Sequence, residues 1–209
     1  MSESEPGLDA TAALSIVTDQ RRTAHSRLTM DARVTYLTWA VAWLVAFGGL
    51  WLALRPQPDQ NPPGWGWAVY GVALGAGIVV TVGYAARRTR GIRGTTVTAM
   101  WLWGLAWFIG YFGGMWGGSV ITAGMTPSHA LITYNLLAAL IPGLLYMALG
   151  TFTADIPSFL VGSWWIVLAV AATLIGVPAG LLVMALGGCA GMLVLTVVET
   201  IRRTHARAA

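Results

Sequence analysis

Ionisable side chains, which usually carry catalysis and ion transport inside membranes, are almost absent from the apolar part of this chain. Between Arg93 and Glu199 lie 105 residues, and Asp155 alone among them carries a formal charge. An embedded carboxylate would indicate proton-coupled transport, a lysine would allow a retinal Schiff base, and clustered histidines, cysteines or carboxylates would hold a metal or haem. The sequence contains none of these patterns and no phosphate-binding loop. We therefore predict no catalytic residue, no metal site and no cofactor.

Four residues remain as candidates for binding a ligand or lining a pore. Asn135 and Tyr134 are the main polar side chains expected inside a membrane-spanning segment. Trp107 belongs to a Trp- and Gly-rich segment that could form an apolar pocket with them. His129 stands at the outer mouth of the segment that holds Asn135, where it could assist hydrolysis of a lipid. The alternative for His129 is a helix-start histidine at the level of the lipid headgroups.

The composition indicates what kind of element holds these residues. Hydrophobic residues make up 56% of the chain and charged residues 10%, with a mean hydropathy of +0.69, whereas soluble domains carry about 25% charged residues. A soluble protein needs charged side chains over its surface, and a bilayer removes that need. The sequence therefore predicts an all-α, polytopic transmembrane helix bundle in contact with the lipid bilayer. The net charge of +4 follows from where the arginines lie and does not indicate binding to nucleic acid.

Six apolar segments are long enough to cross a bilayer, which takes about 20 residues each. Proline-rich, arginine-rich and glycine-containing turns separate them. Ser128 and Asp155 are the predicted N-caps of the fourth and fifth segments. An N-terminal tail (1–33) and a basic C-terminal tail (200–209) flank the membrane domain (34–199). The predicted spans are 34–54, 65–86, 96–119, 129–151, 157–176 and 179–199.

The arginines predict the orientation of the bundle, because cytoplasmic loops carry an excess of basic residues. With six spans, the N-terminal tail, the second loop and the C-terminus lie on one side and hold 11 of the 12 arginines, which leaves Arg55 on the other side. We expect both termini in the cytoplasm of a bacterial cell and the protein in its inner membrane. The second loop also offers cationic contacts to a partner or to lipid headgroups, through Arg87, Arg88, Arg90 and Arg93.

The N-terminal tail predicts an amphipathic surface helix over residues 9–29. Asp9 can cap it, and its apolar residues recur at spacings of three and four. A basic helix of this kind lies on the membrane surface, attracted by anionic lipid. Anchoring to the leaflet is the favoured interpretation, and docking of a cytoplasmic partner is the alternative.

Glycine is abundant, with 26 residues, and several glycines stand four residues apart. Such small-xxx-small pairs let helices approach closely in lipid, where apolar surface alone gives no driving force. Packing within the bundle is the favoured interpretation, and a homo-oligomer interface is the alternative. Gly71/Gly75 and Gly176/Gly180 are two of these pairs, and the predicted packing positions are Gly113, Gly114, Gly117, Gly118, Gly187 and Gly191.

Several segments resemble a group of uncharacterised six-span integral membrane proteins from GC-rich actinobacteria. They are ALSIVTDQRR (13–22), WAVAWLVAFGGLWLAL (39–54), ARRTRGIRG (86–94), GLAWFIGYFG (104–113) and GVPAGLLVMALGGCAG (176–191). The resemblance covers most of the chain. It implies the six-span layout, and it lends no established activity, although some members are labelled transporter or permease.

The leading functional hypothesis is a non-catalytic membrane component, transporter-like or accessory, that works with a partner subunit. A second hypothesis is a sensor or carrier that binds a lipid or small molecule through Asn135 and the Trp- and Gly-rich segments. A third is an enzyme that modifies lipid at the outer leaflet through His129. On balance, the sequence favours a protein that is not an enzyme.

Overall fold

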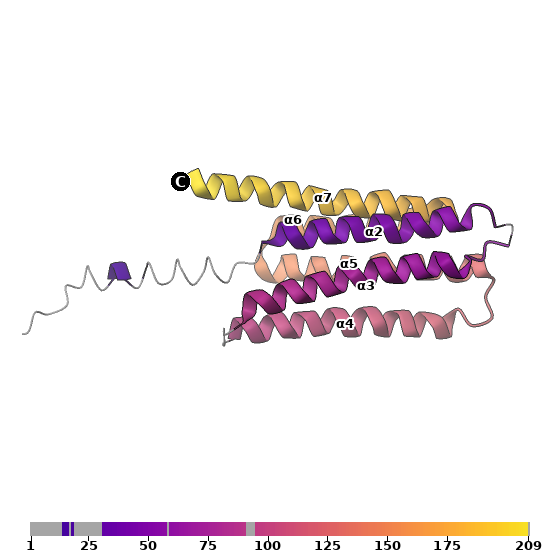
Figure 1. The fold of residues 1–209 in the computed structure, drawn as a ribbon, viewed down its shortest axis with the longest axis horizontal. Coiled ribbons are helices and arrows are strands. Elements are labelled where there is room, and N and C mark those ends of the chain that lie inside the picture. The colour runs from indigo at the N-terminus through magenta and orange to yellow at the C-terminus, as the bar shows by residue number, and fades with distance from the viewer. Residues whose placement is uncertain (1–13, 17, 19–30, 58, 91–94, 209) are drawn as a thin grey trace, which may run out of the picture.

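The computed structural model describes residues 14–16, 18, 31–57, 59–90 and 95–208 (Figure 1). The described residues form helices and turns, without a strand. The six long helices are α2 (Ala32–Leu54), α3 (Gly64–Thr89), α4 (Thr95–Ile121), α5 (Pro127–Thr153), α6 (Ile156–Ile175) and α7 (Ala179–Ala208). The predicted all-helical architecture is therefore confirmed.

Five of the six helices, all except α4, are long and apolar enough to cross a membrane. Helix α4 has 27 residues and no charge, but it contains four tryptophans and six glycines, and these residues lower its hydropathy. Of the predicted amphipathic helix at 9–29, only residues 14–16 and 18 are described. They are helical, and Leu14 and Ile16 are exposed. The rest of that prediction lies outside the described residues.

The helix ends follow local chemistry. Asp155, as predicted, caps α6: its Oδ2 accepts a hydrogen bond from the Ser158 backbone N–H at 3.1 Å. The prediction of Ser128 as the cap of α5 is wrong. Pro127 occupies the first helical turn, where its missing N–H costs nothing, so the cap moves back to Thr126.

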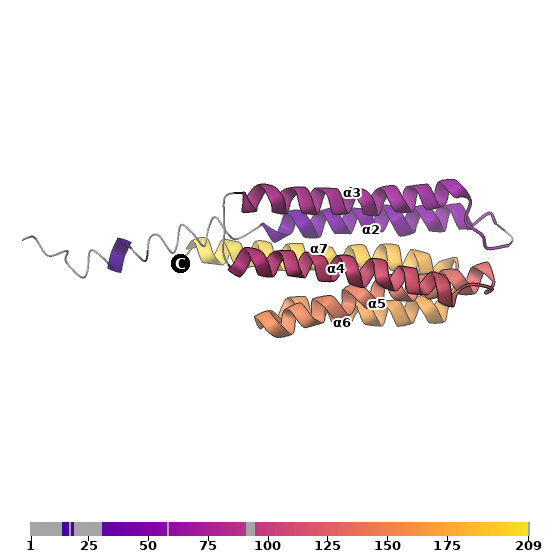
Figure 2. The same cartoon turned by 90° about the horizontal axis from the view of Figure 1, so that it is seen from below.

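Four helices, α2, α5, α6 and α7, form the centre of the bundle, and α3 and α4 stand outside it (Figures 1 and 2). Helix α2 packs against α7 and α3, α6 packs against α5 and α7, and the main contacts of α4 are with α5. Aromatic rings fill the middle. Trp43 stacks on Phe47 with ring centroids 4.6 Å apart and meets Trp165 of α6 at 4.2 Å. Trp165 is 0% exposed, so this ring closes the centre of the bundle.

Glycine brings α5 and α6 into backbone contact. A Cβ at Gly162 would lie 2.5 Å from the Met147 backbone nitrogen, and one at Gly150 would lie 2.5 Å from the Phe159 nitrogen. At Gly143 an added Cβ would lie 2.9 Å from the Ile166 side chain. No larger residue fits at these positions without moving a helix, because real Cβ contacts are not that short.

Candidate functional site

Asn135 is the most unusual polar side chain in the described part of the bundle. It lies on α5 and is 3% exposed. Its Oδ1 atom has no hydrogen-bond partner among the described residues. A buried acceptor left in this state costs about 1–3 kcal/mol relative to one that is hydrogen-bonded. Residues of this kind are retained at functional sites more readily than in plain cores.

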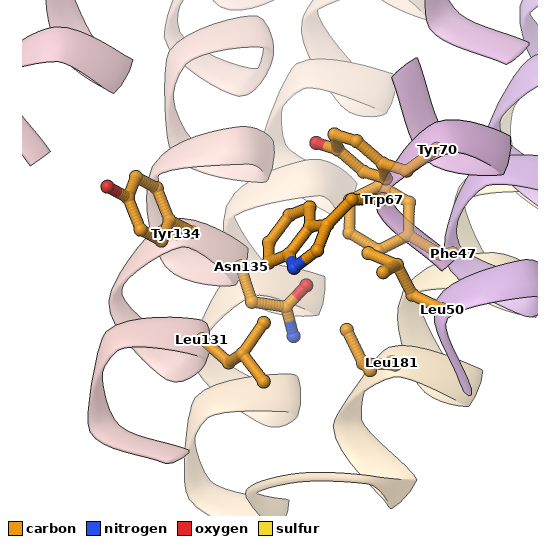
Figure 3. Close-up of a pocket in the computed structure, with 8 residues that line it drawn as sticks. All are labelled: Phe47, Leu50, Trp67, Tyr70, Leu131, Tyr134, Asn135 and Leu181. Atoms are coloured by element: carbon orange, nitrogen blue, oxygen red, sulfur yellow. The ribbon is translucent and has the colours of Figure 1, made fainter. Parts of the chain in front are cut away.

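The Asn135 carboxamide faces a small cavity of about 20 Å³ between α2, α3, α5 and α7 (Figure 3). A cavity of this size holds about one water molecule, which needs two or more polar partners. In the close-up, the Trp67 indole nitrogen is turned towards the Asn135 carboxamide. The walls are otherwise mostly aromatic and aliphatic: Phe47, Leu50, Trp67, Tyr70, Leu131, Tyr134 and Leu181.

Two tyrosines connect the cavity wall to α4. The Tyr70 hydroxyl lies 3.3 Å from the Tyr111 hydroxyl, and the Tyr134 hydroxyl lies 3.4 Å from Thr122 Oγ1. Thr122 Oγ1 in turn lies 2.9 Å from the Gly118 carbonyl oxygen, to which it donates. Helix α4 and Thr122, which follows it, therefore reach the cavity wall through hydroxyl groups.

The other two ligand candidates lie elsewhere. Trp107 on α4 makes an edge contact with Tyr146, with ring centroids 5.6 Å apart, and does not line the cavity. His129 is exposed, and its Nδ1 lies 2.6 Å from Thr126 Oγ1. The structure thus brings Asn135 and Tyr134 together and leaves Trp107 and His129 apart from them. Among the described residues, no group of three or more His, Cys, Asp or Glu side chains could hold a metal ion.

Sequence reasoning missed the wall residues from α2, α3 and α7, chiefly Phe47, Trp67 and Tyr70. Trp67 falls near the start of the predicted span 65–86, where a tryptophan is expected to lie at the membrane interface. No pattern in the sequence states which helices are neighbours. The only available signal was the aromatic pair Trp67 and Tyr70, which stand three residues apart and share a helix face.

The predicted packing glycines have two kinds of surroundings. A Cβ at Gly118 would lie 2.8 Å from Leu137 of α5, one at Gly191 would lie 2.9 Å from Trp164, and Cβ atoms at Gly114 and Gly187 would press into Ile141 and Leu168. At Gly113 and Gly117, by contrast, an added Cβ would meet nothing within 4 Å. The doubled glycine motif of α4 therefore has one face against α5 and one face open.

Arginines and carboxylates meet at the end of the bundle where α7 finishes (Figure 1). Arg33 Nη2 lies 2.6 Å from Asp31 Oδ2, and Arg202 Nη1 lies 2.6 Å from Asp155 Oδ1. Arg203 lies 3.9 Å from Asp31, which ties the end of α7 to the start of α2. Arg87, Arg88 and Arg90 stand exposed at the end of α3, and Arg93 lies outside the described residues.

These contacts change how the two carboxylates titrate. Hydrogen bonds from the Arg33 side chain are the main cause that lowers the pKa of Asp31 from 3.8 to about 2, and partial burial opposes them. For Asp155, burial acts to raise the pKa, but hydrogen bonds from Ser158 and Arg202 outweigh it, so the pKa lies below its ordinary value. Both side chains are therefore charged at neutral pH and hold helix ends together.

No family model matches this sequence, and neither a curated protein nor a solved structure matches it.

Proposed function

We propose that this chain is a non-catalytic membrane subunit, transporter-like or accessory, that receives a partner helix on the side formed by α3 and α4. One observation carries the proposal: the contacts of α3 are mainly with α2 and those of α4 mainly with α5, so both present long apolar faces outward. Val72, Val79 and Trp116, for example, are each more than 70% exposed. Apolar faces of this kind also suit lipid, so the proposal depends on the small residues within them, which let another helix approach closely.

The open glycines mark where such a helix would lie. A Cβ at Gly71, Gly75, Gly113 or Gly117 would meet nothing within 4 Å. Each pair leaves a shallow notch along its helix, into which a partner backbone can approach closely. A second copy of this chain or a different subunit could supply that backbone.

The membrane arrangement belongs to the same proposal. We infer that α4 is a sixth span, because it has 27 residues without a charge and packs against α5. The end that gathers Arg33, Arg88 and Arg202 then faces the cytoplasm of a bacterial cell, with both termini on that side. The arginines at the end of α3 lie in the headgroup region, available to anionic lipid or to a partner.

Native mass spectrometry of the protein, taken from its own membrane in lipid nanodiscs, tests the proposal. We expect a complex of defined stoichiometry, which Gly117→Leu should reduce at least tenfold. Gly104→Leu is the matched control: it lies thirteen residues away on the other face of α4, and it also has open space around it. A wild-type protein that is monomeric would contradict the proposal, as would equal effects of the two variants.

A second candidate function, the binding of a small neutral molecule, is favoured by the unpaired Asn135 oxygen. Its chemistry selects a hydrogen-bond donor of the size of water, and the Trp67 indole nitrogen is turned towards the same carboxamide (Figure 3). Larger ligands require α3 to move away from α5. The test is isothermal titration of the purified protein with candidate small donors. Asn135→Leu should abolish the heat of binding. His129→Ala should leave that heat unchanged, because His129 lies away from the cavity.

A further inference from the structure

A second hollow lies on the outside of the bundle, where α2 runs between α3 and α7. It is an apolar groove of about 500 Å³. Its floor includes Gly48, Gly49 and Ala185, and its sides are Leu44, Val45, Trp51, Leu52, Trp65, Val69 and Leu182. Leu44, Val45, Leu52 and Trp65 are at least 40% exposed, so the groove opens away from the bundle.

The groove has about the length of one leaflet. From Leu44 to Leu52 an α-helix rises about 12 Å, which is most of half a hydrocarbon core about 30 Å thick.

One end of the groove carries a cation. The guanidinium carbon of Arg55 lies 4.8 Å from the centroid of the Trp51 ring, and Trp51 lines the groove. Arg55 is exposed, and no ion pair in the described part of the chain includes it. The Trp51 ring stands beside it and Trp65 lines the same groove; amphipathic rings of this kind favour the depth of lipid headgroups.

We propose that this groove is a binding site for one glycerophospholipid. An acyl chain lies over Gly48, which has open space beside it, and the phosphate binds the Arg55 guanidinium through charge-assisted hydrogen bonds. The charge of the phosphate matches the one cation at the mouth, and the apolar floor matches the chain. This site is separate from the α3–α4 side and does not depend on the partner proposed above.

Delipidated protein in detergent, titrated with phosphatidylglycerol and with diacylglycerol of the same chains, tests the proposal by native mass spectrometry. We expect one phosphatidylglycerol per protein, retained at least tenfold better than diacylglycerol. Gly48→Leu fills the floor and should reduce retention of phosphatidylglycerol at least tenfold. Its Cβ has only the Ala185 Cβ near it, at 4.0 Å, so the backbone need not move. Arg55→Gln should remove the preference for phosphatidylglycerol over diacylglycerol.

Gly83→Leu is the control, since it adds the same side chain to open space on α3, outside the lining of the groove. It should leave retention unchanged. If Gly48→Leu does not fold, Gly48→Ala and the exposed Arg55→Gln carry the test. If Gly48→Leu retained phosphatidylglycerol as well as the wild type does, the proposal would be overturned. So would an unchanged preference for phosphatidylglycerol in Arg55→Gln.

Discussion

Glycine has opposite roles in the centre of the bundle and in its outer layer. Between α5 and α6, Gly150 and Gly162 sit where a Cβ would strike the backbone of the facing helix. On α3 and on the open face of α4, Gly75 and Gly113 sit where a Cβ would strike nothing within 4 Å. The residue type is the same, and only the neighbouring helix differs. Where α5 and α6 meet, glycine allows a close backbone contact, and in the outer layer it faces open space.

The two regions also differ in how their large side chains are buried. Trp165 in the centre is 0% exposed, whereas Trp116 on α4 is 78% exposed. In water, a tryptophan as exposed as Trp116 would be unfavourable. In a bilayer it would not be, because the lipid around α4 and the centre of the bundle are both apolar. Stability in the centre therefore comes from close packing, since the hydrophobic effect does not separate buried from lipid-facing positions.

The largest effect is expected from Gly162→Leu. The new side chain would meet the Met147 backbone nitrogen and the Gly143 carbonyl oxygen, neither of which can turn aside as a flexible side chain can. Overpacking of this kind costs about 3 kcal/mol or more, so we expect loss of the monodisperse peak in size-exclusion chromatography. Gly75→Leu, with open space around it, should keep that peak. A well-behaved Gly162→Leu protein would contradict the proposed difference between the two regions.

Trp165→Ala should have the second-largest effect. It should lower the free energy of unfolding by about 3–5 kcal/mol, as for other buried aromatic residues. The ring contacts Trp43 and would leave an empty volume that the four central helices cannot close. Trp116→Ala on the exposed face of α4 should change the same quantity by less than about 0.5 kcal/mol. Denaturation in mixed micelles, followed by circular dichroism, measures both. Equal losses would mean that α4 is as tightly held as α6.

The positions of the helices could be predicted from the sequence, because length, apolarity and turn residues are local properties. The close contact of α5 with α6 could not. Gly143, Gly150 and Gly162 form no pair at four-residue spacing, and their role depends on which helix faces them. The packing face and the open face of α4 could not be distinguished either, since Gly113/Gly117 and Gly114/Gly118 have the same spacing.

The candidate site was partly predictable for the same reason. Asn135 is recognisable in the sequence because an amide within an apolar run is rare and costly. Its surroundings are not, since Phe47, Trp67 and Leu181 come from three other helices. The cap at Thr126 was missed because Pro127 fits the first helical turn and shifts the start of α5 by two residues.

Asn135→Leu tests whether the centre of the bundle is dry. The Asn135 oxygen has no hydrogen-bond partner among the described residues. If no small molecule occupies the cavity, a leucine of similar size should raise the free energy of unfolding by about 1–2 kcal/mol. Leu131→Ala at the same cavity should lower it, which controls for a general effect of mutating the wall. Thermal unfolding in detergent measures both. A loss of stability in Asn135→Leu would contradict a dry cavity and indicate that the amide holds a hydrogen-bonded molecule.

The smallest effect is expected at the end of the bundle where arginines and carboxylates pair. These ion pairs join α2, α6 and α7 and do not include α4. Because Arg33 lowers the pKa of Asp31 from 3.8 to about 2, the ionised form stabilises the folded state. That contribution is fully present above about pH 4 and is lost as the pH falls through about 2. Asp31→Asn should therefore lower stability by about 1 kcal/mol or less at pH 7, and its difference from wild type should shrink between pH 4 and pH 2.

Asp59→Asn, in the loop at the other end, keeps Asp31 and should retain the wild-type loss in acid. A constant difference between Asp31→Asn and wild type at every pH would mean that Asp31 acts through its hydrogen bonds as a cap and that its charge contributes nothing to holding α2 against α7.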